Sequence, residues 1–151
     1  MSFQIKALEP KQFAATPEES ATVRCLEATT NPGFPCRVSL EDAKLGERVL
    51  ALHYLHHDVD SPYRASGPIF VRALALQGKG RSLQRDEVPD FLRHRQLSIR
   101  GFDAKTMMVY AIAGSGAGLE KLIAAAFDNS EVDYLHIHNA APGCFMCKVE
   151  R

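Results

Sequence analysis

The sequence predicts an α+β fold with a mainly antiparallel sheet of about eight strands, one strong helix over residues 117–128 and one or two short helices. Apolar runs of strand length follow one another along most of the chain, without the regular alternation of strands and helices that a parallel sheet requires. Only one long segment has apolar residues at helical spacing. A chain of 151 residues with 46% hydrophobic residues is the size of one domain with one core, so we expect a single domain over residues 1–151.

The N-terminal half is predicted to consist mainly of strands. "SFQIKAL" and "TVRCLEATT" alternate apolar and polar residues, which is typical of strands with one wet face. Between them, "TPEES" predicts a short helix, because Thr16 can cap it and Pro17 suits the first helical position. "RVLALHYL" and "IFVRALAL" predict two further strands, and the polar loop "HHDVDSPYRASGP" that joins them is long enough to carry functional residues.

The C-terminal half contains the strong helix between two predicted hairpins. "DEVPDFLRHRQ" predicts a second short helix, since Pro89 lies near its start, and "LSIRGFDAKTMMVYAIAG" predicts two paired strands. "VDYLHIHN" and "CFMCKVE" predict a last hairpin around Pro142 and Gly143, which suit a type II turn. The strong helix has one apolar face, formed by Leu119, Leu122, Ile123, Ala126 and Phe127.

The charge balance and the apolar content argue against two classes of partner. Lysine plus arginine (18) equals aspartate plus glutamate (18), so no net field attracts nucleic acid or an anionic membrane surface. No apolar stretch approaches the roughly 20 residues that a membrane span needs. Cysteines at irregular spacing without an export signal are typical of free thiols. We therefore expect a cytoplasmic protein that binds neither nucleic acid nor membranes.

Several segments carry a family resemblance. Three segments carry most of it, namely "PGFPCRVSLEDA", "SPYRASGPIFVR" and "PGCF", and two more fit it, "LSIRGFDA" and "VDYLHIHNA". On these segments the chain resembles the bacterial domain-of-unknown-function family numbered 1203. The resemblance covers essentially the whole chain. It implies a single-domain protein of bacterial type, and it implies no particular activity, substrate or cofactor.

The C-terminal hairpin "YLHIHNAAPGCFMCK" has the highest density of metal-ligating residue types in the chain. On a regular strand His136 and His138 share a face, whereas Cys144 and Cys147 point to opposite faces. The turn would place His138 opposite either Cys144 or Cys147, depending on its length. The hairpin can therefore offer a metal at most three ligands, His136, His138 and Cys144, and a closed zinc site would need a fourth from elsewhere, for example Cys36.

We favour the interpretation that this stretch is an ordinary hairpin, in which the cysteines pack as small apolar side chains and the histidines lie on a partly solvent-exposed face. We therefore predict no cofactor, and zinc binding is the minority hypothesis. "HYLHHD" is a second histidine-rich stretch. On a regular strand His53 and His57 share a face while His56 points away from them. These histidines are therefore not expected to form a compact metal site.

Two loops place an arginine beside rigid proline and glycine backbone. "GFPCRVS", the PCR loop, contains Cys36 and Arg37, and "SPYRASGP", the SPYR loop, contains Tyr63 and Arg64. A guanidinium held by stiff backbone suits a carboxylate or a phosphate. As plain turns, the same loops would use their arginines in ordinary salt bridges.

The leading functional hypothesis is an anionic small molecule bound in a pocket of the PCR loop, the SPYR loop and the C-terminal hairpin. Arg37 and Arg64 would hold the anion, and Cys36, Tyr63, His136 and His138 would complete the pocket. No nucleophile, base and orienting group can be assembled from the sequence, so the catalytic residues are unknown and the sequence does not decide whether the protein is an enzyme. The competing hypothesis is a non-enzymatic interaction protein, a homodimer through an exposed strand edge.

Overall fold

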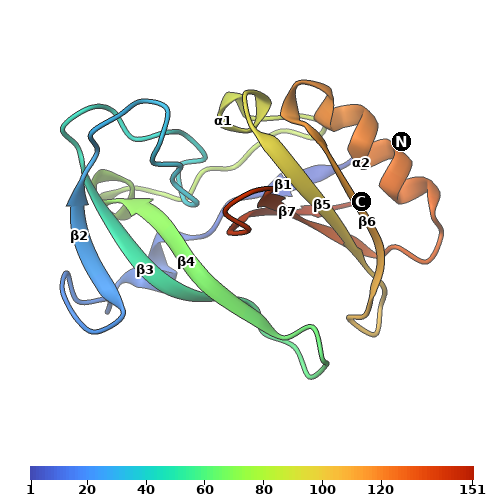
Figure 1. The fold of residues 1–151 in the computed structure, drawn as a ribbon, viewed down its shortest axis with the longest axis horizontal. Coiled ribbons are helices and arrows are strands. Elements are labelled where there is room, and N and C mark those ends of the chain that lie inside the picture. Colours follow the sequence, from blue (N-terminus) through green and yellow to red (C-terminus); the bar gives the residue numbers. More distant parts are fainter.

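The computed structural model describes residues 1–151 and confirms an α+β fold built on two antiparallel sheets (Figure 1). The larger sheet has the strand order β1-β8-β7-β5-β6, and the smaller has the order β2-β3-β4. The larger sheet consists of β1 (Gln4–Lys6), β5 (Gln96–Phe102), β6 (Met108–Ser115), β7 (Tyr134–Asn139) and β8 (Phe145–Glu150). The smaller sheet consists of β2 (Val23–Glu27), β3 (Arg48–His57) and β4 (Ala65–Arg72).

The helices are few and mostly short, as expected. The main helix α2 (Leu119–Asp128) continues from the short 3-10 helix η3 (Gly116–Gly118), and α1 (Asp90–Arg93) directly precedes β5. Two further 3-10 helices are η1 (Pro10–Phe13) and η2 (Ala73–Gln77). None of the helices is long and apolar enough to cross a membrane.

The major core lies between one face of the larger sheet and α2. Its fully buried side chains include Leu97, Ile99, Leu135, Ile137 and Val149 from the strands, and Leu119, Ile123 and Ala126 from the helix region. Because successive side chains on a strand point to opposite faces, the residues between these apolar positions line the other face. That second face carries Ser98 and Arg100 from β5 and His136 and His138 from β7.

The smaller sheet has its own apolar cluster and reaches toward the second face of the larger sheet. Leu50, Leu52, Ile69 and Val71 of β3 and β4 pack with Phe13, Val23, Cys36 and Val38. The long β3–β4 hairpin extends from this cluster toward the lower ends of β5 and β7 in the view of Figure 1. Its regular pairing is interrupted by a register shift between Tyr54 and His57, which is a β-bulge.

The short helix predicted at "TPEES" is absent, and the chain there has only bends and an isolated β-bridge at Ser20. The helical turn lies earlier, at Pro10–Phe13. Pro10 occupies its first position, and the side chain of Gln12 accepts a hydrogen bond of 2.8 Å from the backbone amide of Glu9. The helix expected from Thr16 and Pro17 was therefore wrong, and Glu9, Pro10 and Gln12 supply the corresponding cap pattern earlier in the chain.

Candidate functional site

Two histidines of β7 lie buried on the second face of the larger sheet. His136 and His138 keep only 3% and 1% of their surface exposed. They share this face because they are two residues apart on a regular strand, as the sequence predicted. The ring centroids are 6.2 Å apart, and the ring of Phe145 from β8 contacts both.

A third histidine, His56, reaches this pair from the other sheet. Its ring centroid lies 5.0 Å from that of His138 and 6.0 Å from that of His136, and the ring stacks on Phe145 at 5.2 Å. One ring nitrogen from each histidine lies within 4.8 Å of the others. We call His56, His136 and His138 the histidine cluster. It joins β3 to β7 across the space between the two sheets.

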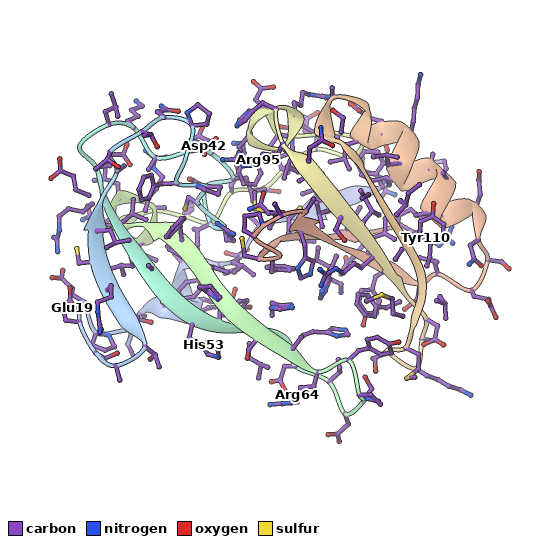
Figure 2. All side chains as sticks on the ribbon, in the orientation of Figure 1. Glu19, Asp42, His53, Arg64, Arg95 and Tyr110 are labelled. Carbon is purple, nitrogen blue, oxygen red and sulfur yellow. The ribbon has the colours of Figure 1, made fainter.

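The bulge in β3 explains why this cluster differs from the sequence-based expectation. On a regular strand the neighbours His56 and His57 would point to opposite faces. In the structure both rings contact His136, because the register shift between Tyr54 and His57 turns the end of the strand. The expectation that His56 points away from His57 was therefore wrong, although His53, His56 and His57 do not form a compact set by themselves. Figure 2 shows His53 on the outer side of β3, where it is exposed.

A second bulge changes the register of the C-terminal hairpin. His138 pairs with Phe145, and Ile137 pairs with Cys147, so a residue is inserted between them on β8. Both registers expected from the sequence, with His138 opposite Cys144 or Cys147, were therefore wrong. Cys147 is buried in the α2 core, where burial raises the pKa of its thiol to about 12.

The tautomer of His138 is fixed by its neighbour. Its Nδ1 lies 2.9 Å from the carbonyl oxygen of Gly143, which can only accept, so Nδ1 carries the proton and Nε2 keeps its lone pair. The Nδ1 atoms of His56 and His136 are buried without any hydrogen-bond partner. Buried polar atoms are nearly always paired, so these two nitrogens are free to interact with a ligand or a water molecule.

All three imidazoles are held neutral. Burial is the main reason that the pKa of His56 falls to about 4, that of His138 to about 3 and that of His136 to about 2, from 6.5. Positive neighbours add to the effect, and Arg100 acts on both His56 and His138. At neutral pH the cluster therefore presents lone pairs, with no protons to displace.

His57 forms a second layer beside the cluster. Its ring packs 4.9 Å from His136 and 4.4 Å from Phe102. The Nδ1 of His57 donates to the carbonyl oxygen of Tyr63 at 2.7 Å, and its Nε2 accepts from the hydroxyl of Tyr134 at 2.6 Å. Both nitrogens are used, so His57 supports the rings of the cluster and is not a free ligand.

The PCR loop packs against the C-terminal hairpin through Arg37, which is only 1% exposed. Its Nε donates to the carbonyl oxygen of Phe145 at 2.6 Å, Nη1 donates to the carbonyl oxygen of Pro35, and Nη2 lies 3.2 Å from Sγ of Cys144. Cys36 is buried completely, and its sulfur accepts from backbone amides of Ser39 and Arg72. Arg37 and Cys144 line a cavity of about 390 Å³, which the histidine cluster does not line.

The SPYR loop lies at the other end of the site. Tyr63 packs its ring 6.1 Å from that of Phe102, next to His57. Arg64 is exposed and pairs with Asp58, and Figure 2 shows it near the end of the β3–β4 hairpin. Of the residues predicted from the sequence, the structure thus brings together His136 and His138, with Tyr63 in the next layer. Arg37 and Cys36 lie behind the hairpin, and Arg64 faces solvent.

Sequence reasoning missed two residues of this site, His56 and Arg100. Arg100 stands directly opposite His136 in the register of β5 and β7. The signal for Arg100 is the alternation in "LSIRGF", which places Ser98, Arg100 and Phe102 on one face. No comparable signal exists for His56, because a bulge breaks the alternation on which such an assignment depends.

The family described as "Protein of unknown function (DUF1203)" matches residues 33–151. The chain belongs to the DUF1203 family. The region shared with DUF1203 includes the whole histidine cluster, the PCR loop and the SPYR loop, whereas β1 and β2 precede it. No curated protein and no solved structure matches the chain.

Proposed function

We propose that the histidine cluster binds one divalent transition-metal ion, with zinc as the best match. The observation that carries this proposal is the approach of three neutral imidazole nitrogens to within 4.8 Å of one another. Imidazole is the commonest protein ligand of zinc, and a set of three protein ligands leaves a position for water or substrate. The cluster would therefore be an open metal centre of the kind that binds and polarises small molecules.

The orphaned nitrogens favour a metal over simple packing. An unpaired buried polar atom costs roughly 1–3 kcal/mol, and the cluster contains two, on His56 and His136. Apolar side chains of similar size would avoid this cost on an otherwise aromatic surface. A metal ion supplies the missing partner, while Gly143 orients His138 in the way that second-layer groups orient metal ligands.

The spacing of the nitrogens is compatible with such an ion. Zinc–nitrogen bonds of about 2.0–2.1 Å in a tetrahedral arrangement place the nitrogens roughly 3.4 Å apart. Binding would draw the rings inward by small rotations, and His56 is the least buried member of the cluster. The absence of carboxylates and thiolates from the cluster favours zinc, copper, nickel or cobalt over magnesium or calcium.

The anionic small molecule predicted from the sequence would bind beside this centre. The PCR loop contacts the hairpin at Phe145, and the carbonyl group of Tyr63 in the SPYR loop contacts His57. The SPYR loop therefore reaches the layer next to the cluster, whereas Arg37 and Cys36 of the PCR loop lie behind the hairpin. The free thiols of all four cysteines support the cytoplasmic setting within the same proposal.

Self-association is the competing proposal, and it has one supporting observation. β6 is one of the two edge strands of the larger sheet, and Ile112 on it is 39% exposed. An edge strand with an apolar side chain can pair with a second copy of the chain. Native mass spectrometry of the purified protein tests both proposals at once, because it reports bound metal and subunit number.

The decisive experiment measures metal content and affinity in protein purified without an affinity tag. We expect one zinc or cobalt ion per chain after incubation and dialysis. His56→Gln should weaken binding by about 100-fold or more, since it removes one of three ligands. His53→Gln is the matched control, because this histidine lies on the same strand and is exposed.

Circular dichroism must show that both variants are folded. Wild-type protein that retains no metal, or a His56→Gln variant that binds as tightly as His53→Gln, would contradict the proposal. The wild-type result stands even if a variant fails to fold.

A further inference from the structure

The charges around the histidine cluster are unusual for a cation site. In the sheet register His136 lies between Arg100 on β5 and Lys148 on β8. Both neighbours are basic, and residues directly opposite on adjacent strands have Cβ atoms roughly 5 Å apart. On the far side of the hairpin the guanidinium of Arg37 is also close enough to act on His138. The cluster itself contributes no negative charge.

Glu150, the acidic residue next to Lys148 on the same face of β8, is already paired. Glu150 accepts from Lys148 at 2.9 Å and lies 3.7 Å from Lys6 on β1. It offsets the charge of Lys148 in part and leaves Arg100 without a carboxylate. A divalent ion on three neutral imidazoles keeps its full charge, so metal and arginine together form a strongly positive centre.

Arg100 has hydrogen-bonding capacity to spare. Its Nε donates to the hydroxyl of Ser98 at 3.2 Å, and this contact fixes the guanidinium over the same sheet face as the cluster. It forms no salt bridge, unlike Arg64, Arg72, Arg93 and Arg95. Arg100 is half-buried, and the side chain of Lys148 is 39% exposed, so solvent reaches this face. A fixed guanidinium with free terminal nitrogens is suited to a carboxylate or a phosphate.

We propose that the open position of the metal is filled by an oxygen of an anionic small molecule, and that Arg100 binds a second oxygen of the same carboxylate or phosphate group. This inference rests on the proposed metal site. It assigns to Arg100 the role that sequence reasoning gave to Arg37 and Arg64. Arg37 donates to backbone carbonyls and a thiol inside the protein, and Arg64 pairs with Asp58 in solvent.

The anion completes the site in two ways. It neutralises charge that the protein leaves uncompensated, which a neutral ligand such as water does not. It also bridges metal and guanidinium, so that each fixes one oxygen and the group is oriented for polarisation by the metal. The substrate class is therefore a small carboxylate or phosphate compound.

The test uses protein loaded with cobalt, whose visible absorption reports a change of ligand. Inorganic phosphate and acetate are titrated separately into the wild-type protein, Arg100→Met and Arg64→Met. We expect at least one of the two anions to shift the spectrum of the wild-type protein. The anion that binds more tightly shows whether the site prefers a phosphate or a carboxylate. Arg100→Met should weaken binding of that anion by about 10- to 100-fold, as expected for loss of charge-assisted hydrogen bonds. It should bind cobalt at least as tightly as the wild type, because it removes a positive charge beside the ion. Arg64→Met should match the wild type in both respects.

The outcomes separate this inference from the proposed function. Failure of the wild-type protein to bind cobalt would overturn the metal site itself. Cobalt binding with a spectrum that neither anion changes would leave the metal site intact and overturn the anion. An anion effect that Arg100→Met retains, or that Arg64→Met loses, would overturn the assignment of Arg100. If Arg100→Met fails to fold, Arg100→Lys replaces it, because a lysine keeps the charge and loses the two-pronged contact.

Discussion

Lowering the pH should destabilise the metal-free protein because two buried histidines resist protonation. Burial lowers the pKa of His136 to about 2 and that of His138 to about 3, from 6.5. The unfolded chain takes up a proton on each residue near its ordinary pKa, and the folded chain does not. Stability is therefore fully present above about pH 6.5 and falls as the pH drops below it, down to about pH 3 for His138 and about pH 2 for His136.

The size of the effect follows from proton linkage. Between about pH 7.5 and about pH 5.5 each such histidine removes roughly 1 kcal/mol from the free energy of unfolding, so the two together remove roughly 2 to 3 kcal/mol. His56 is half-buried and adds a smaller amount. The sum is a large fraction of the 5–15 kcal/mol that is typical of a folded domain.

Urea unfolding followed by circular dichroism measures this change, with a chelator present throughout. The m value, which is the slope of the free energy of unfolding against urea concentration, should be the same at both pH values, because the folded structure is the same. His53→Gln should show the wild-type loss, whereas His138→Gln should show about half of it. A wild-type loss below about 0.5 kcal/mol would refute the reasoning, since it would mean that the buried imidazoles take up protons in the folded state.

Two further predictions concern the metal and the fold. Because the three histidines are already neutral, zinc affinity of the folded protein should change less than about threefold between about pH 7.5 and about pH 5.5 in isothermal titration, whereas ligands of ordinary pKa would lose affinity steeply. A steep loss would contradict the low pKa values. Gly116→Ala should cost about 3 kcal/mol or more in urea unfolding, because its Cβ would lie 1.8 Å from the carbonyl oxygen of Leu92. Gly118→Ala is the control, since its Cβ meets nothing within 4 Å, and equal stability of the two variants would contradict the close contact.

Local sequence patterns predicted the parts of the protein in which neighbours along the chain decide the structure. The apolar face of α2 and the alternation in β5 and β7 depend only on the periods of helix and strand. They determine which residues enter the major core. They also place His136 and His138 together on the opposite face, which is half of the candidate site.

Long-range contacts decided the rest. His56 joins the cluster because a bulge reorients the end of β3 and because the smaller sheet packs across the larger one. Neither event leaves a periodic signal, since a bulge is an interruption of the period. In the same way, the sequence predicts that Arg37 lies in a stiff loop, but burial by the C-terminal hairpin depends on residues more than a hundred positions away.

The sequence by itself thus determined the fold class, the main helix and the two histidines of β7, because each follows from the spacing of side chains along a single element. Only the tertiary structure decided that a third histidine completes the cluster, that Arg37 donates hydrogen bonds to the C-terminal hairpin and that Arg100 forms no salt bridge. These assignments depend on which elements meet and on which charges are already paired. That information lies in the packing of the two sheets against each other.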